Sequence, residues 1–223
     1  NGLSTIQVGE LEFGQPSRIS AVISAGDSEI IDIERESDLG GDIHTKGILI
    51  LNAYIKGKYA KQKSLPFSSS ITFEQNYMQI DGDSASLAEL CALLSAISKI
   101  PIKQDIAITG SVDQHGNVQA VGSINEKIEG FFSICKMKKL NTQQGVIIPE
   151  TNKKQLMLKE ELIHACQTYR FSVYSVKHVE QAFSILTGLP ESRCHEIITK
   201  RIKELAISSE AEATPAHKKN KKQ

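Results

Sequence analysis

The sequence predicts a single α+β domain in residues 1–206, with mixed β-sheets packed against helices, and a flexible tail in residues 207–223. Strand-patterned and helix-patterned segments both occur along the chain. One pair of strands carries a hairpin signal, and another strand is continuously apolar, which is typical of a buried strand. A chain of 223 residues is long enough to bury a substantial core, and no internal repeat is visible.

The overall composition is that of a globular protein, with 40% hydrophobic and 23% charged residues. The 26 basic residues are balanced by 26 acidic ones, so charge gives no reason to expect nucleic acid or an anionic membrane as a partner. No apolar run approaches the roughly 18 residues of a membrane span, and no signal peptide is expected. Because the chain starts at Asn1, within a patterned segment, we expect it to be a domain of a longer protein.

The cysteines and histidines form no pattern that indicates a metal site. No C-x-x-C pair occurs, so we expect free thiols in a reducing compartment and a cytoplasmic location. The histidines are scattered, and the phosphate-binding G-x-x-x-x-G-K-[ST] loop is absent. We therefore expect neither a metal nor a cofactor in this chain. The residues concerned are Cys91, Cys135, Cys166, Cys194, His44, His115, His164, His178, His195 and His217.

The first segments of the chain have a strand pattern. Residues 18–24 and 29–34 alternate apolar and polar side chains on either side of a turn at 25–28, and residues 8–13 form a shorter candidate closed by Gly14-Gln15-Pro16. The apolar residues of segment 45–61 are too dense for a thin amphipathic stripe. That spacing predicts a largely buried helix, ended by Gly57 and the charged stretch 61–63.

The segment Gln79–Ile97 is the centre of the domain. After a strand at 69–75, a polar Asp81-Gly82-Asp83 turn leads into an alanine-rich helix that Ile100-Pro101 ends. Its apolar residues have core-facing spacing: Leu87, Leu90, Cys91, Leu94 and Ile97. Ser84, at the hinge, has the place of a nucleophile beside free N–H groups, and equally that of an ordinary capping residue. Ser86 and Glu89 have capping-box spacing.

The second half alternates strands and helices. Residues 105–112 and 118–121 are expected to pair across a hairpin at His115-Gly116-Asn117, and a helix runs from Ser123 to about Lys139. The remaining expected elements are a buried strand at 145–149, one or two helical pieces at 151–167, a strand at 171–176, and helices at 179–186 and 193–206.

Three motifs resemble one known family. They are Asp81-Gly-Asp-Ser-Ala-Ser86, Thr109-Gly-Ser-Val112 and Val121-Gly-Ser-Ile-Asn-Glu-Lys-Ile128, and they open one helix, end a strand and open a second helix. In this order and spacing they resemble the proteolytic domain of the Lon family of ATP-dependent serine peptidases. The resemblance extends from about Val8 to Gly188. The Gly-Asp-Ser-Ala-Ser form is similar to the B-type branch, and Ser123 replaces a glycine of the commoner lysine motif.

The resemblance implies a ribosomal protein S5 domain 2-like fold and a Ser-Lys dyad. By position, Ser84 is the nucleophile, Lys127 its general base, Thr109 the residue that orients the amine, and Asp81 the acid of the turn. A lysine serves as base only when neutral, so its pKa must fall from about 10.4, mainly through burial. We therefore expect Glu126 and Glu129 to point away from Lys127.

The resemblance also implies protein substrates, a homo-hexamer and an upstream AAA+ module that uses ATP outside this chain. The expected activity is endoproteolysis of unfolded or damaged proteins through an acyl-enzyme. Two alternatives stay open: a non-catalytic Lon-like module for assembly or substrate binding, and a self-contained peptidase that needs no ATPase. Glu74, on the strand before the turn, is a weaker candidate for the wall of the site.

Overall fold

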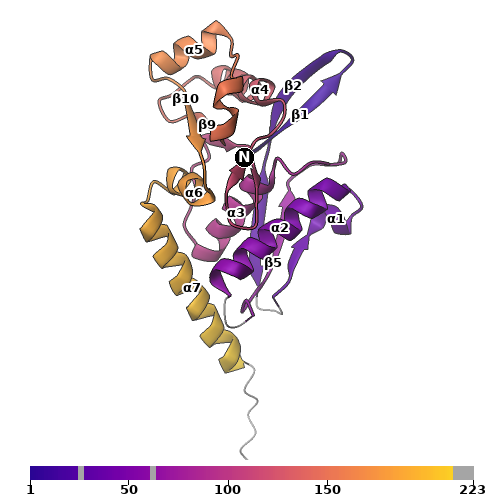
Figure 1. Ribbon diagram of the computed structural model, residues 1–223, viewed down its shortest axis with the longest axis vertical. Coiled ribbons are helices and arrows are strands. Elements are labelled where there is room, and N and C mark those ends of the chain that lie inside the picture. Colours follow the sequence, from indigo (N-terminus) through magenta and orange to yellow (C-terminus); the bar gives the residue numbers. More distant parts are fainter. Residues whose placement is uncertain (25–27, 61–63, 213–223) are drawn as a thin grey trace, which may run out of the picture.

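The computed structural model describes residues 1–24, 28–60 and 64–212 (Figure 1). Within them the chain forms an α+β fold with a five-stranded, a three-stranded and a two-stranded sheet, as the sequence predicted. The expected turn at 25–28 lies mostly outside these ranges, as do the charged stretch 61–63 and residues 213–223. No helix in the described ranges combines the length and apolarity needed to cross a membrane.

The five-stranded sheet has the order β10-β9-β6-β1-β2. Neighbouring strands are parallel except for β1 and β2, which form an antiparallel hairpin. The strands are β1 (Gly2–Val8), β2 (Leu11–Ser17), β6 (Ile106–Ile108), β9 (Gly145–Pro149) and β10 (Ser172–Val176). The buried strand expected at 145–149 is thus confirmed as β9.

The prediction of one strand over Val8–Phe13 is wrong, because the chain reverses inside it. Val8 pairs with Leu11, and Gly9 has φ 63°, which glycine adopts without strain at the first position of a two-residue turn. Pro16 was expected to close the strand but lies within β2. An edge strand tolerates proline because one side of its backbone has no partner strand.

The three-stranded sheet has the order β3-β5-β4, with β3 at Ile19–Ser24, β5 at Ser68–Phe73 and β4 at Ile30–Asp32. The strand expected to reach residue 34 ends early, since α1 (Ile33–Glu36) follows β4 directly. Glu34 is buried there, and its carboxylate accepts a hydrogen bond from Phe73 N at 2.9 Å. This contact from β5 stabilises a helical turn where the local pattern indicated a strand.

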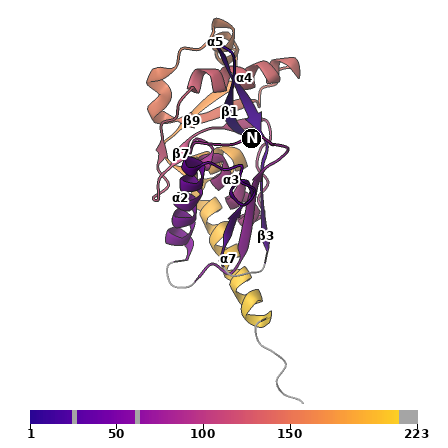
Figure 2. The ribbon, with the colours of Figure 1, turned by 90° about the vertical axis from the view of Figure 1, so that its right-hand side faces the viewer.

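The helix α3 (Ser86–Ser98) is central to the lower part of the molecule, where it packs against β3, α2, α6 and α7 (Figures 1 and 2). The predicted core-facing stripe of α3 is confirmed, since all five of its residues are buried. The surrounding helices are α2 (Asp42–Tyr59), α6 (Val179–Thr187) and α7 (Glu191–Glu212). Because α7 continues to Glu212, the first part of the expected tail is helical.

The remaining elements include the helix that carries Lys127, the predicted general base. The expected hairpin is confirmed as β7 (Ser111–Val112) paired with β8 (Val118–Gln119). It leads into α4 (Ile124–Met137). The expected helical pieces after β9 are a 3₁₀ helix, η1 (Glu150–Gln155), and α5 (Glu160–Gln167).

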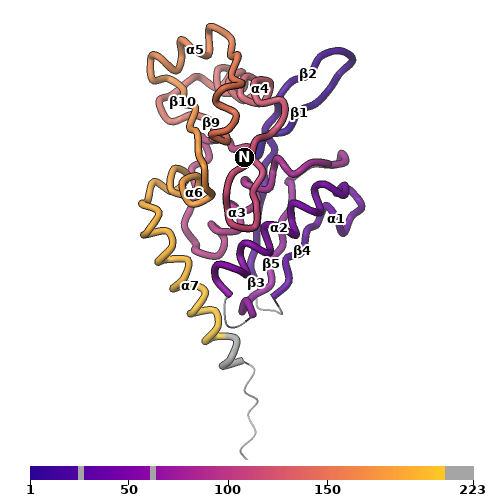
Figure 3. Tube along the Cα trace, in the orientation of Figure 1, coloured from indigo at the N-terminus to yellow at the C-terminus, as the bar shows by residue number. Residues whose placement is uncertain are grey.

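The five-stranded sheet separates two hydrophobic clusters. In β9, Ile147 packs with the cluster that contains α3, whereas Val146 and Ile148 pack with the cluster that contains α4. Successive side chains of a strand point to opposite faces, so α3 and α4 cover opposite faces of this sheet. Figure 3 shows α4 and α5 with β9 and β10 in the upper part, and α2 and the three-stranded sheet below.

Candidate active site

The turn that carries Ser84 lies directly before α3. The predicted capping box is wrong: Ala85 occupies the N-cap position, and the Ser86 hydroxyl accepts a hydrogen bond from Val112 N at 3.1 Å. Glu89 is buried, and its carboxylate lies 3.7 Å from His44. These tertiary contacts replace the local cap, and the side chain of Ser84 is not used for capping.

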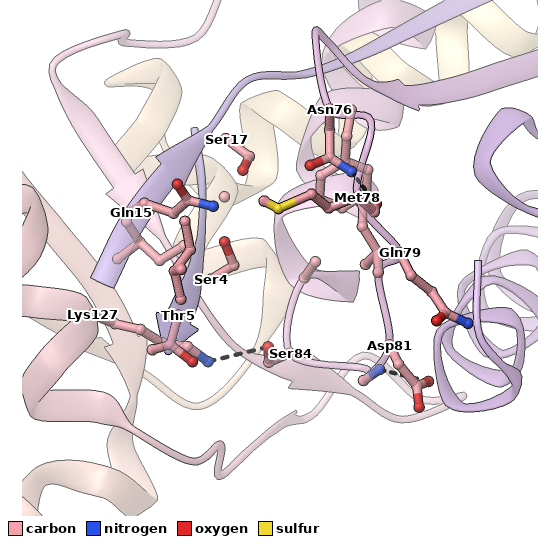
Figure 4. A pocket seen from close by; sticks show the side chains of 17 residues that line it. Ser4, Thr5, Gln15, Ser17, Asn76, Met78, Gln79, Asp81, Ser84 and Lys127 are labelled. Carbon is pink, nitrogen blue, oxygen red and sulfur yellow. Dashed lines mark hydrogen bonds between the residues drawn. The ribbon is translucent and has the colours of Figure 1, made fainter. Parts of the chain in front are cut away.

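Ser84 and Lys127 meet in one pocket, although the turn before α3 carries Ser84 and the helix α4, on the opposite face of the sheet, carries Lys127. Lys127 Nζ donates a hydrogen bond to Ser84 Oγ at 3.1 Å, and the two side chains point toward each other (Figure 4). Lys127 lies in the first turn of α4 and is only 5% exposed. The structure therefore brings together the two residues that the motifs predicted as a pair.

Burial lowers the pKa of Lys127, while the negative charges of Glu12 and Asp83 oppose this effect. Desolvation is thus the main cause of the shift, as the sequence reasoning required. Neither Glu126 nor Glu129 is among the charges that act on the pKa of Lys127, in line with the expectation that they point away. Glu129 forms an ion pair with Lys159 at 2.8 Å instead.

The backbone of Ser84 is fixed by the segment that follows β6. Ser84 O accepts hydrogen bonds from Gly110 N at 2.9 Å and from Thr109 Oγ1 at 3.3 Å. Thr109 is fully buried, and its hydroxyl thereby supports Ser84 directly. That the same hydroxyl orients the amine of Lys127 stays a prediction. Next to Ser84, Asp83 accepts a hydrogen bond from Ser111 Oγ at 2.7 Å.

Asp81 lines the pocket and connects its turn to α2. Its Oδ1 accepts hydrogen bonds from Gly82 N at 2.9 Å and from Ile43 N, in the first turn of α2, at 3.2 Å. A carboxylate at this place is favoured by the unpaired N–H groups of the helix start. A Cβ on Gly41 would lie 2.5 Å from Asp81 Oδ1, so the close approach requires glycine there.

The pocket also includes residues that the sequence analysis did not identify. Consecutive residues of β1, from Gly2 to Ile6, form one wall, and residues of the loop 76–80 form another. Glu74 is not among the lining residues, and its carboxylate accepts a hydrogen bond from Ser20. Glu12 was missed because the sequence analysis did not detect the β1–β2 hairpin that places it near Lys127.

A buried ionisable cluster lies where β4, α2 and α3 meet, with Asp32 Oδ2 3.2 Å from His44 Nε2. Burial raises the pKa of Glu89 to about 8, partly offset by His44. Burial opposes protonation of His44, but the nearby carboxylates of Asp32, Glu89 and Glu34 raise its pKa overall. No His, Cys, Asp or Glu side chains in the described ranges are arranged so that three or more could hold a metal ion.

Comparisons with known proteins show the family of the chain. The model of the Lon protease (S16) C-terminal proteolytic domain matches residues 39–187. A Lon protease homolog of Escherichia coli (strain K12) is 51% identical over 177 residues, which cover 79% of this chain and 30% of that protein. A homolog of the same name from Haemophilus influenzae is 48% identical over 84% of this chain and 32% of its own length.

An archaeal Lon protease from Methanocaldococcus jannaschii is 35% identical over 68% of this chain and 22% of its own length. The chain therefore spans at most about a third of the curated relatives described. From the family match and the identities, the chain belongs to the Lon protease family, S16, and comprises its C-terminal proteolytic domain.

Proposed function

We propose that this chain is the serine endopeptidase domain of an ATP-dependent Lon-like protease, with Ser84 as nucleophile and Lys127 as general base. The observation that carries the proposal is the 3.1 Å hydrogen bond between Lys127 Nζ and Ser84 Oγ. It joins a serine that is not used for capping to a buried lysine whose pKa is lowered. A lysine in this setting can be neutral and accept the proton that activates the serine.

The proposed reaction has two halves. In the first, Ser84 Oγ attacks the peptide carbonyl carbon while Lys127 accepts the hydroxyl proton. The lysine then gives this proton to the leaving amine, the C–N bond breaks, and an ester on Ser84 remains. In the second half Lys127 takes a proton from water, the hydroxide oxygen attacks the ester, and the proton returns to Ser84 as the acid product leaves.

The turn supplies donors for the oxyanion. Among the described residues, neither Ser84 N nor Ala85 N donates a hydrogen bond within the chain, and both residues line the pocket. Free backbone N–H groups beside the attacked carbonyl can stabilise the negative charge of the tetrahedral intermediate. The free N–H groups of Ser84 and Ala85 support the assignment of this turn to acyl transfer.

The proposed substrates are proteins in an extended state. The consecutive residues Gly2–Ile6 all line the pocket, although alternate side chains of a strand point to opposite faces, so the pocket follows the edge of β1. In the described ranges β1 pairs with β6 at Gly2 alone, and the rest of this edge can pair with another strand. Such a site accepts an unfolded chain through its backbone and suits substrates of varied sequence.

ATP use, a hexamer and a cytoplasmic location are further parts of the proposal. ATP would be hydrolysed by an AAA+ module outside these residues, which unfolds substrates and delivers them to the pocket. The relatives are about three times as long as the region they share with this chain, which is consistent with such a module. The alternative of a non-catalytic module is disfavoured by the presence of both dyad residues within hydrogen-bond distance.

Cleavage of an unfolded, fluorescently labelled protein tests the proposal, in the longest natural chain that contains this sequence. We expect Ser84→Ala and Lys127→Ala to remove cleavage while melting temperatures stay near that of the unmodified protein. Omitting ATP is expected to stop degradation of a folded substrate and to spare cleavage of a short peptide. Wild-type cleavage by either variant would refute the dyad, and ATP-independent degradation of a folded substrate would favour a self-contained peptidase.

A further inference from the structure

The distance between Ser84 and Lys127 depends on the position of the first turn of α4. Ser84 belongs to the side of the sheet that carries α3, whereas Lys127 lies in the first turn of α4 on the opposite face. Lys127 N donates to Ser123 O at 3.0 Å, so Lys127 moves with the first turn of the helix. The distance between amine and hydroxyl is therefore set by the contacts that fix this turn.

The start of α4 is not held by a cap of its own. Ser123 occupies the N-cap position with φ 52°, and its side chain makes no capping hydrogen bond. The Ser123 hydroxyl instead donates to Glu12 Oε1 at 2.6 Å. An uncapped helix start with a left-handed residue needs support from elsewhere in the fold.

Asn152 provides this support from η1. Its side-chain oxygen accepts a hydrogen bond from Val121 N at 3.1 Å, and its amide nitrogen donates to Val121 O at 2.9 Å. The amide nitrogen also donates to Gln155 Oε1 at 2.6 Å. Asn152 is fully buried and follows β9, a strand buried along its whole length. Its side chain thus binds both backbone groups of one residue, as a neighbouring strand would.

Asn125 forms a second connection between the same two segments. From the first turn of α4, its amide nitrogen donates to Gln155 O at 3.1 Å, and its oxygen accepts from Met157 N at 2.8 Å. The chain before α4 and the first turn of α4 are therefore both tied to residues 152–157. This segment is continuous with the buried strand β9, so it gives the helix a rigid reference.

We propose that Asn152 is a positioning residue for Lys127. By fixing Val121 it holds the start of α4, which keeps the amine of Lys127 buried and within reach of Ser84. The inference rests on the proposed Ser84–Lys127 dyad. Without the Asn152 amide the first turn of α4 moves outward, the amine contacts water, and its pKa rises toward the ordinary lysine value.

The pH dependence of Ser84 acylation separates positioning from general stability. The probe is p-nitrophenyl acetate, and the acetylated peptide containing Ser84 is quantified by mass spectrometry in the longest natural chain that contains this sequence. We expect Asn152→Ala to slow acylation by about 100-fold, as for a displacement of about 1 Å, and to move the half-maximal pH upward. Glu12 and Asp83, the charges that act on Lys127, are unchanged in this variant.

Asn141→Ala is the matched control. Asn141 accepts hydrogen bonds from Gln143 N and Gln144 N in the connection between the C-terminal end of α4 and β9, so its loss lowers stability without touching the start of α4. We expect an unchanged half-maximal pH in this control. Asn125→Ala, at a half-buried position where alanine favours the helix, is expected to shift the half-maximal pH upward by less than Asn152→Ala.

Two results overturn the inference. One is a folded Asn152→Ala protein with the wild-type rate and half-maximal pH. The other is a lower rate with an unshifted half-maximal pH, which indicates a merely structural role. If Asn152→Ala does not fold, Asn125→Ala decides by the same criterion. A wild-type protein that is not acetylated at Ser84, or is acetylated equally after Lys127→Ala, refutes the proposed dyad itself and so is distinguishable from these outcomes.

Discussion

A methyl group added at Gly14 should disable the proposed dyad without changing the identity of either of its residues. Gly14 lies in β2, where the backbone of α4 approaches it directly. A Cβ at this position would lie 2.5 Å from Lys127 Cα and would overlap Glu126 O. A Cβ on Gly130, one turn further along α4, would in turn overlap Gly14 O. The substitution Gly14→Ala therefore forces β2 and the first turns of α4 apart.

The size of the effect follows from these distances. Ordinary van der Waals contact of a Cβ begins at 3.4 Å, so α4 must retreat from β2 by about 1 Å. A retreat of that size would lengthen the Ser84–Lys127 hydrogen bond from 3.1 Å to about 4 Å, beyond hydrogen-bond range. We expect acylation of Ser84 to fall by about 100-fold. Overpacking should also destabilise the fold by about 1–3 kcal/mol.

The assay is acylation of Ser84 by the activated ester, normalised to the folded fraction at a temperature well below the melting transition. Gly57→Ala is the control, because a Cβ on Gly57 in α2 meets nothing within 4 Å. That control should keep its activity and gain about 0.5–1 kcal/mol of stability. A folded Gly14→Ala protein that acylates at the wild-type rate would show that the contact between β2 and α4 does not set the dyad distance.

Two further predictions concern charge. Glu12→Gln removes a negative charge that raises the pKa of Lys127, so the half-maximal pH of Ser84 acylation should fall by a fraction of a pH unit. Because Glu12 is exposed, this shift should shrink in high salt, and a shift in the opposite direction would contradict the assignment. Glu89→Gln tests the buried cluster. Glu89 keeps its proton in the folded state up to about pH 8 but loses it in the unfolded state near pH 4.5. Stability should therefore decline between these values by up to about 1.4 kcal/mol per pH unit from this group, with the raised pKa of His44 acting in the same direction. Denaturant titrations at a series of pH values should show that the stability of Glu89→Gln declines less steeply with pH than that of the wild type. An equally steep decline with pH would refute the view that Glu89 is protonated in the folded state.

The helices and buried strands could be predicted because their apolar residues recur at the spacing of the face, or faces, that the element buries. The stripe of α3 from Leu87 to Ile97 recurs at helical spacing and is buried throughout. Ile147 and its neighbours in β9 are apolar without interruption because that strand is covered on both faces. In such elements the local sequence and the tertiary environment favour the same structure.

The β1–β2 hairpin could not be predicted, because the apolar residues near its turn are exposed and so do not mark a buried face. Val8, Leu11 and Phe13 are exposed on the two strands near the turn, at 59%, 72% and 46% of their surface. Exposed apolar residues therefore stand on both sides of the turn at Gly9, and the reversal was not recognised. One wall of the pocket, which β1 provides, was missed with it.

The meeting of Ser84 and Lys127 could be predicted from motifs, but the contacts that hold them together could not. Ser84 and Lys127 each stand at a helix start with a recognisable sequence. Ser86 and Glu89 show the opposite case, since their spacing fits a local cap and they bind other elements instead. The contact of Asn152 with Val121 joins segments 31 residues apart, and nothing in the local pattern of either segment indicates it.

The most direct test of the Ser84–Lys127 pair is the identity of the residue that carries the acyl group. The longest natural chain that contains this sequence is incubated with the activated ester, digested, and its acetylated peptide sequenced by mass spectrometry. The dyad predicts one dominant adduct on Ser84 that disappears in Lys127→Ala and becomes more abundant as pH rises. A dominant adduct elsewhere, or an adduct on Ser84 that persists undiminished without Lys127, would contradict it.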